Sequence, residues 1–193
     1  MQNHASTLAA EFKLDAARVA ATVALIDEGN TIPFIARYRK EATGSMDDQT
    51  LRALDERLSY LRKLDDQKET VHNSITEQGA MTPEIAAALE KAKTLAEVED
   101  IYRPYKPKRK TRASIARARG LEPLAARLLE QRPEDEPALL ARQYITEEVP
   151  DTEAALAGAR DILAEGFSDS ANLRATLRSL YNATALVESK AAK

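Results

Sequence analysis

The chain has 193 residues, enough for one substantial hydrophobic core or two small ones, and its net charge of −3 does not by itself suggest a nucleic-acid partner. It has no cysteine, which excludes disulfides and thiolate zinc sites, and its two histidines lie outside any metal-ligand spacing. It shows neither a signal peptide nor an uncharged apolar run of the roughly 18 residues that a membrane helix needs, so we expect a cytoplasmic protein without metal or cofactor.

The composition favours helices throughout. Only six glycines, no tryptophan and 5% aromatic residues accompany abundant Ala, Leu, Glu, Arg and Lys. No segment alternates apolar and polar residues with the period of a strand. We therefore predict an all-α fold: a multi-helix array with a helix-turn-helix-like N-terminal part and a long antiparallel helical hairpin.

The N-terminal part comprises residues 1–45. Asp15 can cap a helix with an apolar face, and Gly29 fits the position after its end, where the chain turns left-handed. A second short helix follows, and we predict that its Phe34 and Tyr38 face the core. Two short helices across such a turn resemble a helix-turn-helix unit.

The clearest predicted helix runs from Asp47 to Gln78, because leucines recur at 3-4-3 spacing from Leu51 onward. Charged residues midway predict that its second half is only partly buried. Thr82, followed by proline and an acid, restarts a helix whose apolar side faces back. Residues 46–102 are thus predicted to form the long helical hairpin.

Two prolines, Pro104 and Pro107, end the hairpin, because the residue before a proline is pushed out of helical geometry. We expect residues 103–119 to form a basic linker and residues 120–193 to form further helices. The last of these carries an apolar stripe almost to the final residue with no later element to cover it, so we expect the native chain to continue.

The basic linker is the main candidate functional segment. It holds eight basic residues and no acidic one: Arg103, Lys106, Lys108, Arg109, Lys110, Arg112, Arg117 and Arg119. The remaining 20 basic residues are outnumbered by the chain's 31 acidic ones. Phosphate binding depends on local charge density, and Tyr102 and Tyr105 between the cations offer faces on which bases can stack. This pattern indicates contact with RNA or DNA without sequence preference.

Two interpretations of the basic linker stay open. In the first, the prolines keep the segment extended and its cations contact phosphates. In the second, the cations pair with the protein's own acidic surface, within this region or between domains, and the tyrosines belong to the core. The two interpretations can coexist.

A smaller basic group lies beside Phe34 and Tyr38 and consists of Arg37, Arg39 and Lys40. These three are secondary candidates for nucleic-acid contact. The solvated back of an apolar helix is the stronger explanation for them.

Paired acids, Asp47-Asp48, Asp65-Asp66 and Glu147-Glu148, do not predict a metal-dependent enzyme. Adjacent residues on a helix point about 100° apart and do not converge on one ion. The chain also has no P-loop, dinucleotide-binding or nucleophile-elbow motif. We expect a protein that binds and does not catalyse.

Three segments resemble signatures of the Tex family of bacterial transcription accessory proteins. They are LIDEGNTIPFIARYRKEATG at residues 25–44, IYRPYKPKRKT at residues 101–111 with GLEPL at residues 120–124, and GARDILAE at residues 158–165. The resemblance covers nearly the whole chain in the family's order.

The resemblance implies a multidomain nucleic-acid-binding factor of which this chain is the helical N-terminal region. The family's RNase H-like YqgF domain, helix-hairpin-helix units and OB-type RNA-binding domain are absent from it. The expected partners are RNA or DNA, the downstream domains and RNA polymerase. The alternative is a scaffold that docks those domains or the polymerase without touching nucleic acid.

Overall fold

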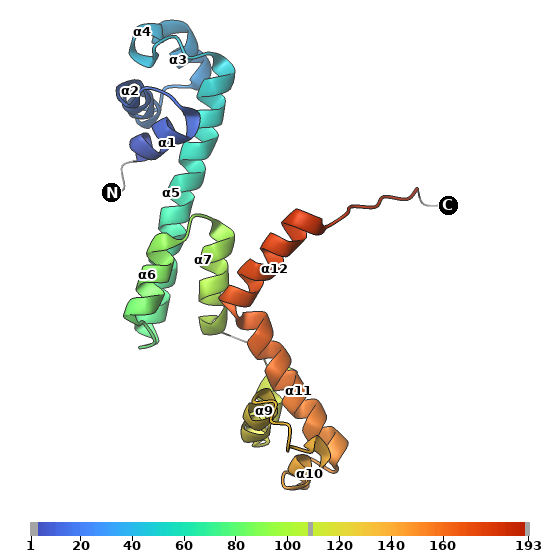
Figure 1. Cartoon of the computed structure of the whole chain (residues 1–193). Helices are drawn as coiled ribbons and strands as arrows, with labels where there is room; N and C mark the ends of the chain where they lie inside the picture. Colours follow the sequence, from blue (N-terminus) through green and yellow to red (C-terminus); the bar gives the residue numbers. More distant parts are fainter. Residues whose placement is uncertain (1–3, 108–109, 192–193) are drawn as a thin grey trace. The chain divides into compact units, whose positions relative to one another are not determined.

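The computed structural model describes residues 4–107 and 110–191, and within these ranges it contains twelve α-helices, one 3-10 helix and no strand (Figure 1). The all-α prediction is confirmed. The chain divides into two compact units: Met1–Gly79 with Lys93–Leu95, and Ala80–Ala92 with Ala96–Lys193. Each unit has its own buried cluster of side chains.

The first unit contains α1 (His4–Phe12), α2 (Ala16–Asp27), α3 (Ile32–Tyr38), α4 (Lys40–Thr43) and α5 (Asp48–Glu77). Its core forms where α1 and α2 pack against the first half of α5, through Leu8, Ala9, Val19, Leu54, Leu58 and Leu61. The predicted cap at Asp15 is confirmed, because its carboxylate accepts a hydrogen bond from the Arg18 backbone N–H at 3.0 Å. Gly29 follows α2 with a φ of 84°, as predicted.

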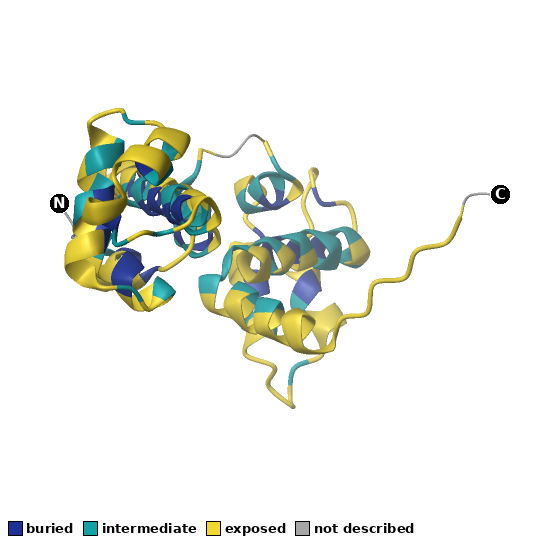
Figure 2. Ribbon diagram, turned by 90° about the horizontal axis from the view of Figure 1, so that it is seen from above, coloured by how far each residue is buried: buried dark blue, intermediate teal, exposed yellow. Residues whose placement is uncertain are grey.

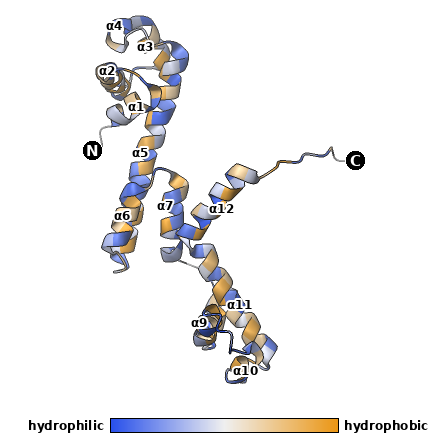
Figure 3. Ribbon diagram, viewed as in Figure 1, coloured by the Kyte–Doolittle hydropathy of each residue, from blue (hydrophilic) through white to orange (hydrophobic). Residues whose placement is uncertain are grey.

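The long helix α5 matches its predicted limits, with Asp47 accepting a hydrogen bond from the Thr50 backbone N–H at 2.6 Å as the N-cap. Bands of hydrophobic and hydrophilic residues alternate along it (Figure 3). The predicted partial burial of its second half is confirmed: Leu64, Val71 and Ile75 are buried, but residues 65–70 include no buried residue. The polar and charged residues between Leu64 and Val71 thus interrupt the buried stripe midway along the helix.

The second unit contains α6 (Pro83–Lys91), α7 (Leu95–Tyr102), the 3-10 helix η1 (Arg103–Tyr105), α8 (Arg112–Ala118), α9 (Glu122–Leu129), α10 (Pro137–Arg142), α11 (Thr152–Asp169) and α12 (Ala171–Thr184). Helices α8, α9 and α10 all pack against α11. Buried residues line the inner faces of these helices, whereas α12 contributes none (Figure 2).

The helical hairpin would pair α5 of the first unit with α6 of the second, so it stays a prediction. The helix-turn-helix likeness of α2 and α3 also stays a prediction.

The placing of Phe34 and Tyr38 in the core was wrong: 36% of Phe34 and 61% of Tyr38 are exposed, and only Ile35 of α3 is buried. In this short helix Ile35 alone is buried, and the aromatic pair lies on either side of it in the sequence.

Candidate nucleic-acid interface

The basic segment starts where α7 ends. Arg103 and Pro104 follow, and residues 103–105 form a 3-10 turn that the sequence did not predict. In this turn Arg103 donates to the Asp169 carboxylate at the end of α11, with a nitrogen–oxygen distance of 3.2 Å. Lys106 pairs with Glu99 of α7, and its ammonium lies 5.6 Å from the centre of the Tyr102 ring. These two cations therefore bind groups of their own unit.

Arg117 of α8 is also engaged internally. Its guanidinium donates to Glu165 of α11 at 2.5 Å and lies 3.5 Å from Glu122. The Thr111 hydroxyl, which caps α8, donates to the other oxygen of Glu165 at 3.0 Å. The hydrogen bond to Glu165 raises the pKa of Arg117, which stays charged in any case. Glu165 thus fixes the start and the far side of α8 against α11.

The remaining described cations of the segment are Lys110, Arg112 and Arg119, and all three are exposed. The side chains of Lys110 and Arg112 form no ion pair or hydrogen bond with any residue that the structure describes. Arg119 lies 3.8 Å from Glu148, whose side chain is 73% exposed, so this pair contributes little. We call these three residues the α8 cation row, since Arg112 begins α8, Arg119 directly follows it and Lys110 lies just before its capping residue. Because Arg112 and Arg119 are seven residues apart, two turns of helix place them on one side.

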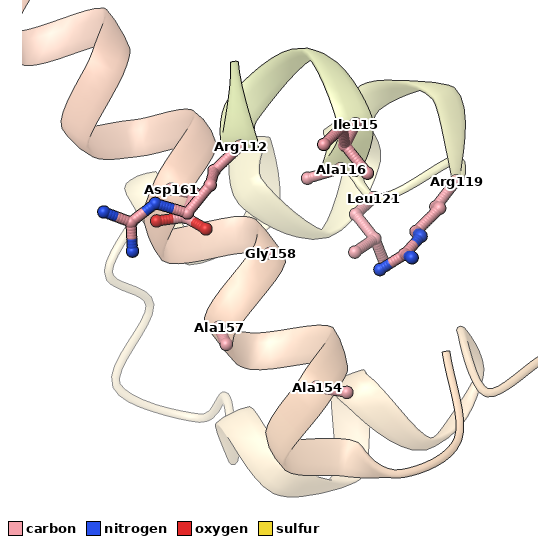
Figure 4. Close-up of a pocket in the computed structure, with 9 residues that line it drawn as sticks. All are labelled: Arg112, Ile115, Ala116, Arg119, Leu121, Ala154, Ala157, Gly158 and Asp161. Carbon is pink, nitrogen blue, oxygen red and sulfur yellow. The ribbon is translucent and has the colours of Figure 1, made fainter. Parts of the chain in front are cut away.

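A pocket of about 360 Å³ lies beside the α8 cation row, between α8 and α11 (Figure 4). Its lining consists of Arg112, Ile115, Ala116, Arg119, Leu121, Ala154, Ala157, Gly158 and Asp161. Arg112 and Asp161 lie at one end of it and Arg119 at the other (Figure 4). Between these charges the lining is aliphatic, with no aromatic ring among its residues.

The predicted site is thus divided by the structure. Arg103, Lys106 and Arg117 pair with acids, while the α8 cation row faces solvent. Tyr105 is half-buried, and Lys108 and Arg109 lie outside the described residues. That any of these residues contacts nucleic acid stays a prediction.

The second basic group lies on α3 and at the α3–α4 junction. Arg37, Arg39 and Lys40 are exposed and form no ion pair with any residue in the described ranges. The Arg39 guanidinium lies 5.4 Å from the centre of the Phe34 ring, and the Phe34 and Tyr38 rings lie 5.1 Å apart. Sequence reasoning favoured a solvated helix back here and missed that the aromatic rings share the same exposed surface.

A charge cluster that the sequence did not predict joins α7 to α12. Asp100 is only 3% exposed, and its carboxylate accepts hydrogen bonds from Arg174 at 2.6 Å and Arg178 at 2.5 Å. Burial alone would raise the pKa of Asp100, but the hydrogen bonds from the two arginines outweigh it and lower that pKa. The one available signal was the i,i+4 spacing of the arginines, which does not identify an acid more than 70 residues away.

No group of three or more His, Asp or Glu side chains in residues 4–107 and 110–191 could hold a metal ion. In the same ranges, no helix combines the length and the apolar character needed to cross a membrane.

Comparisons with known proteins match both ends of the chain. A model of the Tex-like protein N-terminal domain matches residues 2–76, and a Tex central region-like model matches residues 132–193. Protein tex of Bordetella pertussis is 51% identical over 185 residues, which cover 95% of this chain and 23% of that protein. Transcriptional accessory protein Tex of Neisseria gonorrhoeae is 49% identical over 171 residues, 89% of this chain and 22% of the relative.

A more distant similarity reaches beyond bacteria. S1 RNA-binding domain-containing protein 1 of Homo sapiens is 37% identical over 110 residues, which cover 56% of this chain and 11% of that protein. The chain spans less than a quarter of the length of the bacterial relatives it matches.

Proposed function

Because the chain belongs to the Tex family, we propose that it acts as the N-terminal region of a nucleic-acid-binding transcription accessory factor and contributes a basic surface to RNA or DNA binding. The observation that carries this proposal is the α8 cation row. Lys110, Arg112 and Arg119 are exposed without a strong partner, in a chain whose other basic residues are outnumbered by acids. Such cations displace counterions from phosphates regardless of base sequence.

The names of the relatives support a role in transcription and RNA binding. One relative is named a transcriptional accessory protein and another an S1 RNA-binding domain-containing protein. Neither name denotes a class of enzyme, which agrees with a binding role for this chain.

The α8 cation row is tested by reversing its charge. The triple variant Lys110→Glu, Arg112→Glu, Arg119→Glu is expected to bind a fluorescein-labelled 20-nucleotide RNA at least about tenfold more weakly, since up to three phosphate contacts are lost. Fluorescence anisotropy at constant salt measures the affinity. The matched control reverses three exposed cations elsewhere, Lys63, Lys91 and Arg142, and so gives the same net charge. Equal losses in both variants would mean that only overall charge matters, and no loss in the first would refute the proposal.

A second candidate function is a scaffold that docks other domains of the longer protein or RNA polymerase. It is favoured by the ion pairs of Arg103, Lys106 and Arg117, which connect the basic segment to α7 and α11. The scaffold predicts weak binding by the 193-residue chain but altered assembly of the full-length protein when these pairs are broken. Titrating the same RNA with the chain and with the full-length protein, each with and without Arg117→Gln, separates the two functions.

A further inference from the structure

Two aromatic side chains on α3 are exposed and do not contribute to the buried core of the first unit. Phe34 is 36% exposed and Tyr38 is 61% exposed, and their rings lie 5.1 Å apart with a 44° tilt. The chain has only nine Phe and Tyr residues in 193, so two adjacent exposed ones are a notable apolar surface. Contiguous apolar surface on a folded unit commonly marks a binding site.

Three exposed cations lie close to these rings in the sequence and form no ion pair with any described residue. They are Arg37, Arg39 and Lys40, with the Arg39 guanidinium 5.4 Å from the centre of the Phe34 ring. A second arginine–aromatic pair in the same unit, Arg57 over Tyr60, provides the contrast. There the guanidinium donates twice to Glu11, at 2.7 Å each, so its charge is already satisfied.

We call Phe34, Tyr38, Arg37, Arg39 and Lys40 the aromatic–cation surface. The local backbone holds it in place. The Thr43 hydroxyl is buried and donates to the Arg39 carbonyl at 3.2 Å, which fixes the corner between α3 and α4. Gly44 then turns left-handed with a φ of 68°, and the Arg18 side chain packs against it so closely that a Cβ there would lie 2.5 Å from Arg18 Cδ. The corner lies at the end of the unit where α5 begins (Figure 1).

This chemistry selects for unpaired bases. Exposed aromatic faces bind the flat face of a base by stacking, and neighbouring cations bind the phosphates on either side of it. In a duplex the base faces are already stacked on each other and are not available to a side chain. A peptide with acidic residues would use the cations but not two adjacent ring faces.

We propose that Phe34 and Tyr38, together with Arg37, Arg39 and Lys40, form a stacking site for unpaired bases of single-stranded nucleic acid. This inference deepens the proposed function by naming the form of nucleic acid, and it places a contact in the unit that does not contain the α8 cation row.

The test uses the 193-residue chain and two fluorescein-labelled probes, a 15-nucleotide oligo(dT) and a 15-base-pair duplex. Tyr38→Ala is expected to weaken oligo(dT) binding by about tenfold, because one stacked base is lost. It is expected to change duplex binding less than about twofold. Tyr38→Phe retains the ring and should bind oligo(dT) like the wild type. Tyr181→Ala removes a tyrosine of similar exposure, 65%, from α12 and should also bind normally.

The outcomes separate this inference from the proposed function. If Tyr38→Ala binds oligo(dT) normally while charge reversal of the α8 cation row weakens it, the stacking site is wrong and the proposed function stands. An equal loss on oligo(dT) and on duplex also overturns stacking, since it would reflect general damage or charge. If the wild-type chain binds neither probe, both proposals fail, and the α3 surface is one for protein partners. Thermal unfolding followed by circular dichroism verifies that each variant is folded.

Discussion

Asp100 shows how a single buried charge can fix the position of a helix. Its carboxylate is almost completely removed from solvent, yet it accepts hydrogen bonds from two arginines one helical turn apart on α12. Charge-assisted hydrogen bonds of this kind are stronger than neutral ones. Since α12 contributes no fully buried residue, this carboxylate is its main specific attachment within the second unit.

The substitution Asp100→Asn is therefore expected to destabilise the protein. Breaking a buried ion pair commonly costs 3–5 kcal/mol, but Arg174 and Arg178 are about one third exposed and water compensates them in part, so we expect about 1–3 kcal/mol. Urea unfolding followed by circular dichroism measures the change. Asp48→Asn removes an exposed partner of Arg52 and should change little. Equal effects of the two substitutions would contradict the role of Asp100.

The same carboxylate predicts a dependence of stability on pH. The folded protein lowers the pKa of Asp100 below its ordinary 3.8, so the unfolded chain takes up the proton first as the pH falls. The stabilisation is thus fully present above pH 3.8 and is lost as the pH falls through the folded-state pKa. We expect the difference in unfolding free energy between wild type and Asp100→Asn to be constant from pH 5 to 7, to shrink below pH 3.8, and to be measurable by urea unfolding across that range. A constant difference down to pH 2.5 would argue against titration of Asp100.

At the scale of elements, the close packing of α8 and the start of α9 on α11 depends on a glycine. A Cβ at Gly158 would overlap Leu121 Cδ1 and lie 3.2 Å from Ala116 Cβ. Leu121 is itself 1% exposed, and its Cδ1 would have to shift to admit a Cβ at Gly158. Gly166 lies in the same helix, but a Cβ there meets no atom within 4 Å.

These two glycines provide a matched pair of substitutions. Gly166→Ala is expected to raise the free energy of unfolding by up to about 1 kcal/mol, because alanine is the better helix former. Gly158→Ala makes the same gain but must displace Leu121, and overpacking costs about 1–3 kcal/mol, so we expect a net loss of about 1 kcal/mol. Thermal or urea unfolding gives both values. A stabilising Gly158→Ala would show that the α8–α11 contact is looser than the structure has it.

The elements that the sequence predicted well are those with long, regular signals. Helix α5 carries seven buried apolar positions along thirty residues and begins at a capping aspartate, so both its extent and its inward side could be predicted. Helix α3 has seven residues, and a pattern that short does not distinguish a buried ring from an exposed one. Phe34 and Tyr38 were misplaced for that reason.

The candidate site shows the same limit over longer distances. The cluster of cations was visible in the sequence. Which of its cations pair with acids and which face solvent was not. Arg103 pairs with an acid 66 residues later, and Arg117 with one 48 residues later. The local sequence pattern does not show such distant partners. Lys110 and Arg112 belong to the same cluster of cations as Arg103 and Arg117, and only the fold shows that they are unpaired among the described residues.

For the whole molecule, the proposed phosphate contacts are local cations in a weakly acidic chain. The net charge of −3 opposes a nucleic acid at long range, and only contacts within about 10 Å at 0.1 M salt escape screening. Binding should therefore be local and strongly dependent on salt. The cations of the basic segment therefore fall into two groups. We propose that Lys110, Arg112 and Arg119 contact phosphates, whereas Arg103, Lys106 and Arg117 stabilise the fold through their ion pairs.

A salt titration of RNA binding tests that claim most directly. The logarithm of the association constant is measured between 50 and 200 mM KCl for the wild type and for the variants Arg112→Gln, Arg119→Gln and Arg117→Gln. Each phosphate contact adds about 0.7 to the slope against the logarithm of salt concentration for a single strand. We predict that Arg112→Gln with Arg119→Gln reduces the slope by about 1.4 and leaves stability unchanged, whereas Arg117→Gln lowers stability and leaves the slope unchanged. A smaller slope for Arg117→Gln than for the wild type, or equal slopes in all variants, would contradict the proposed division of the cations.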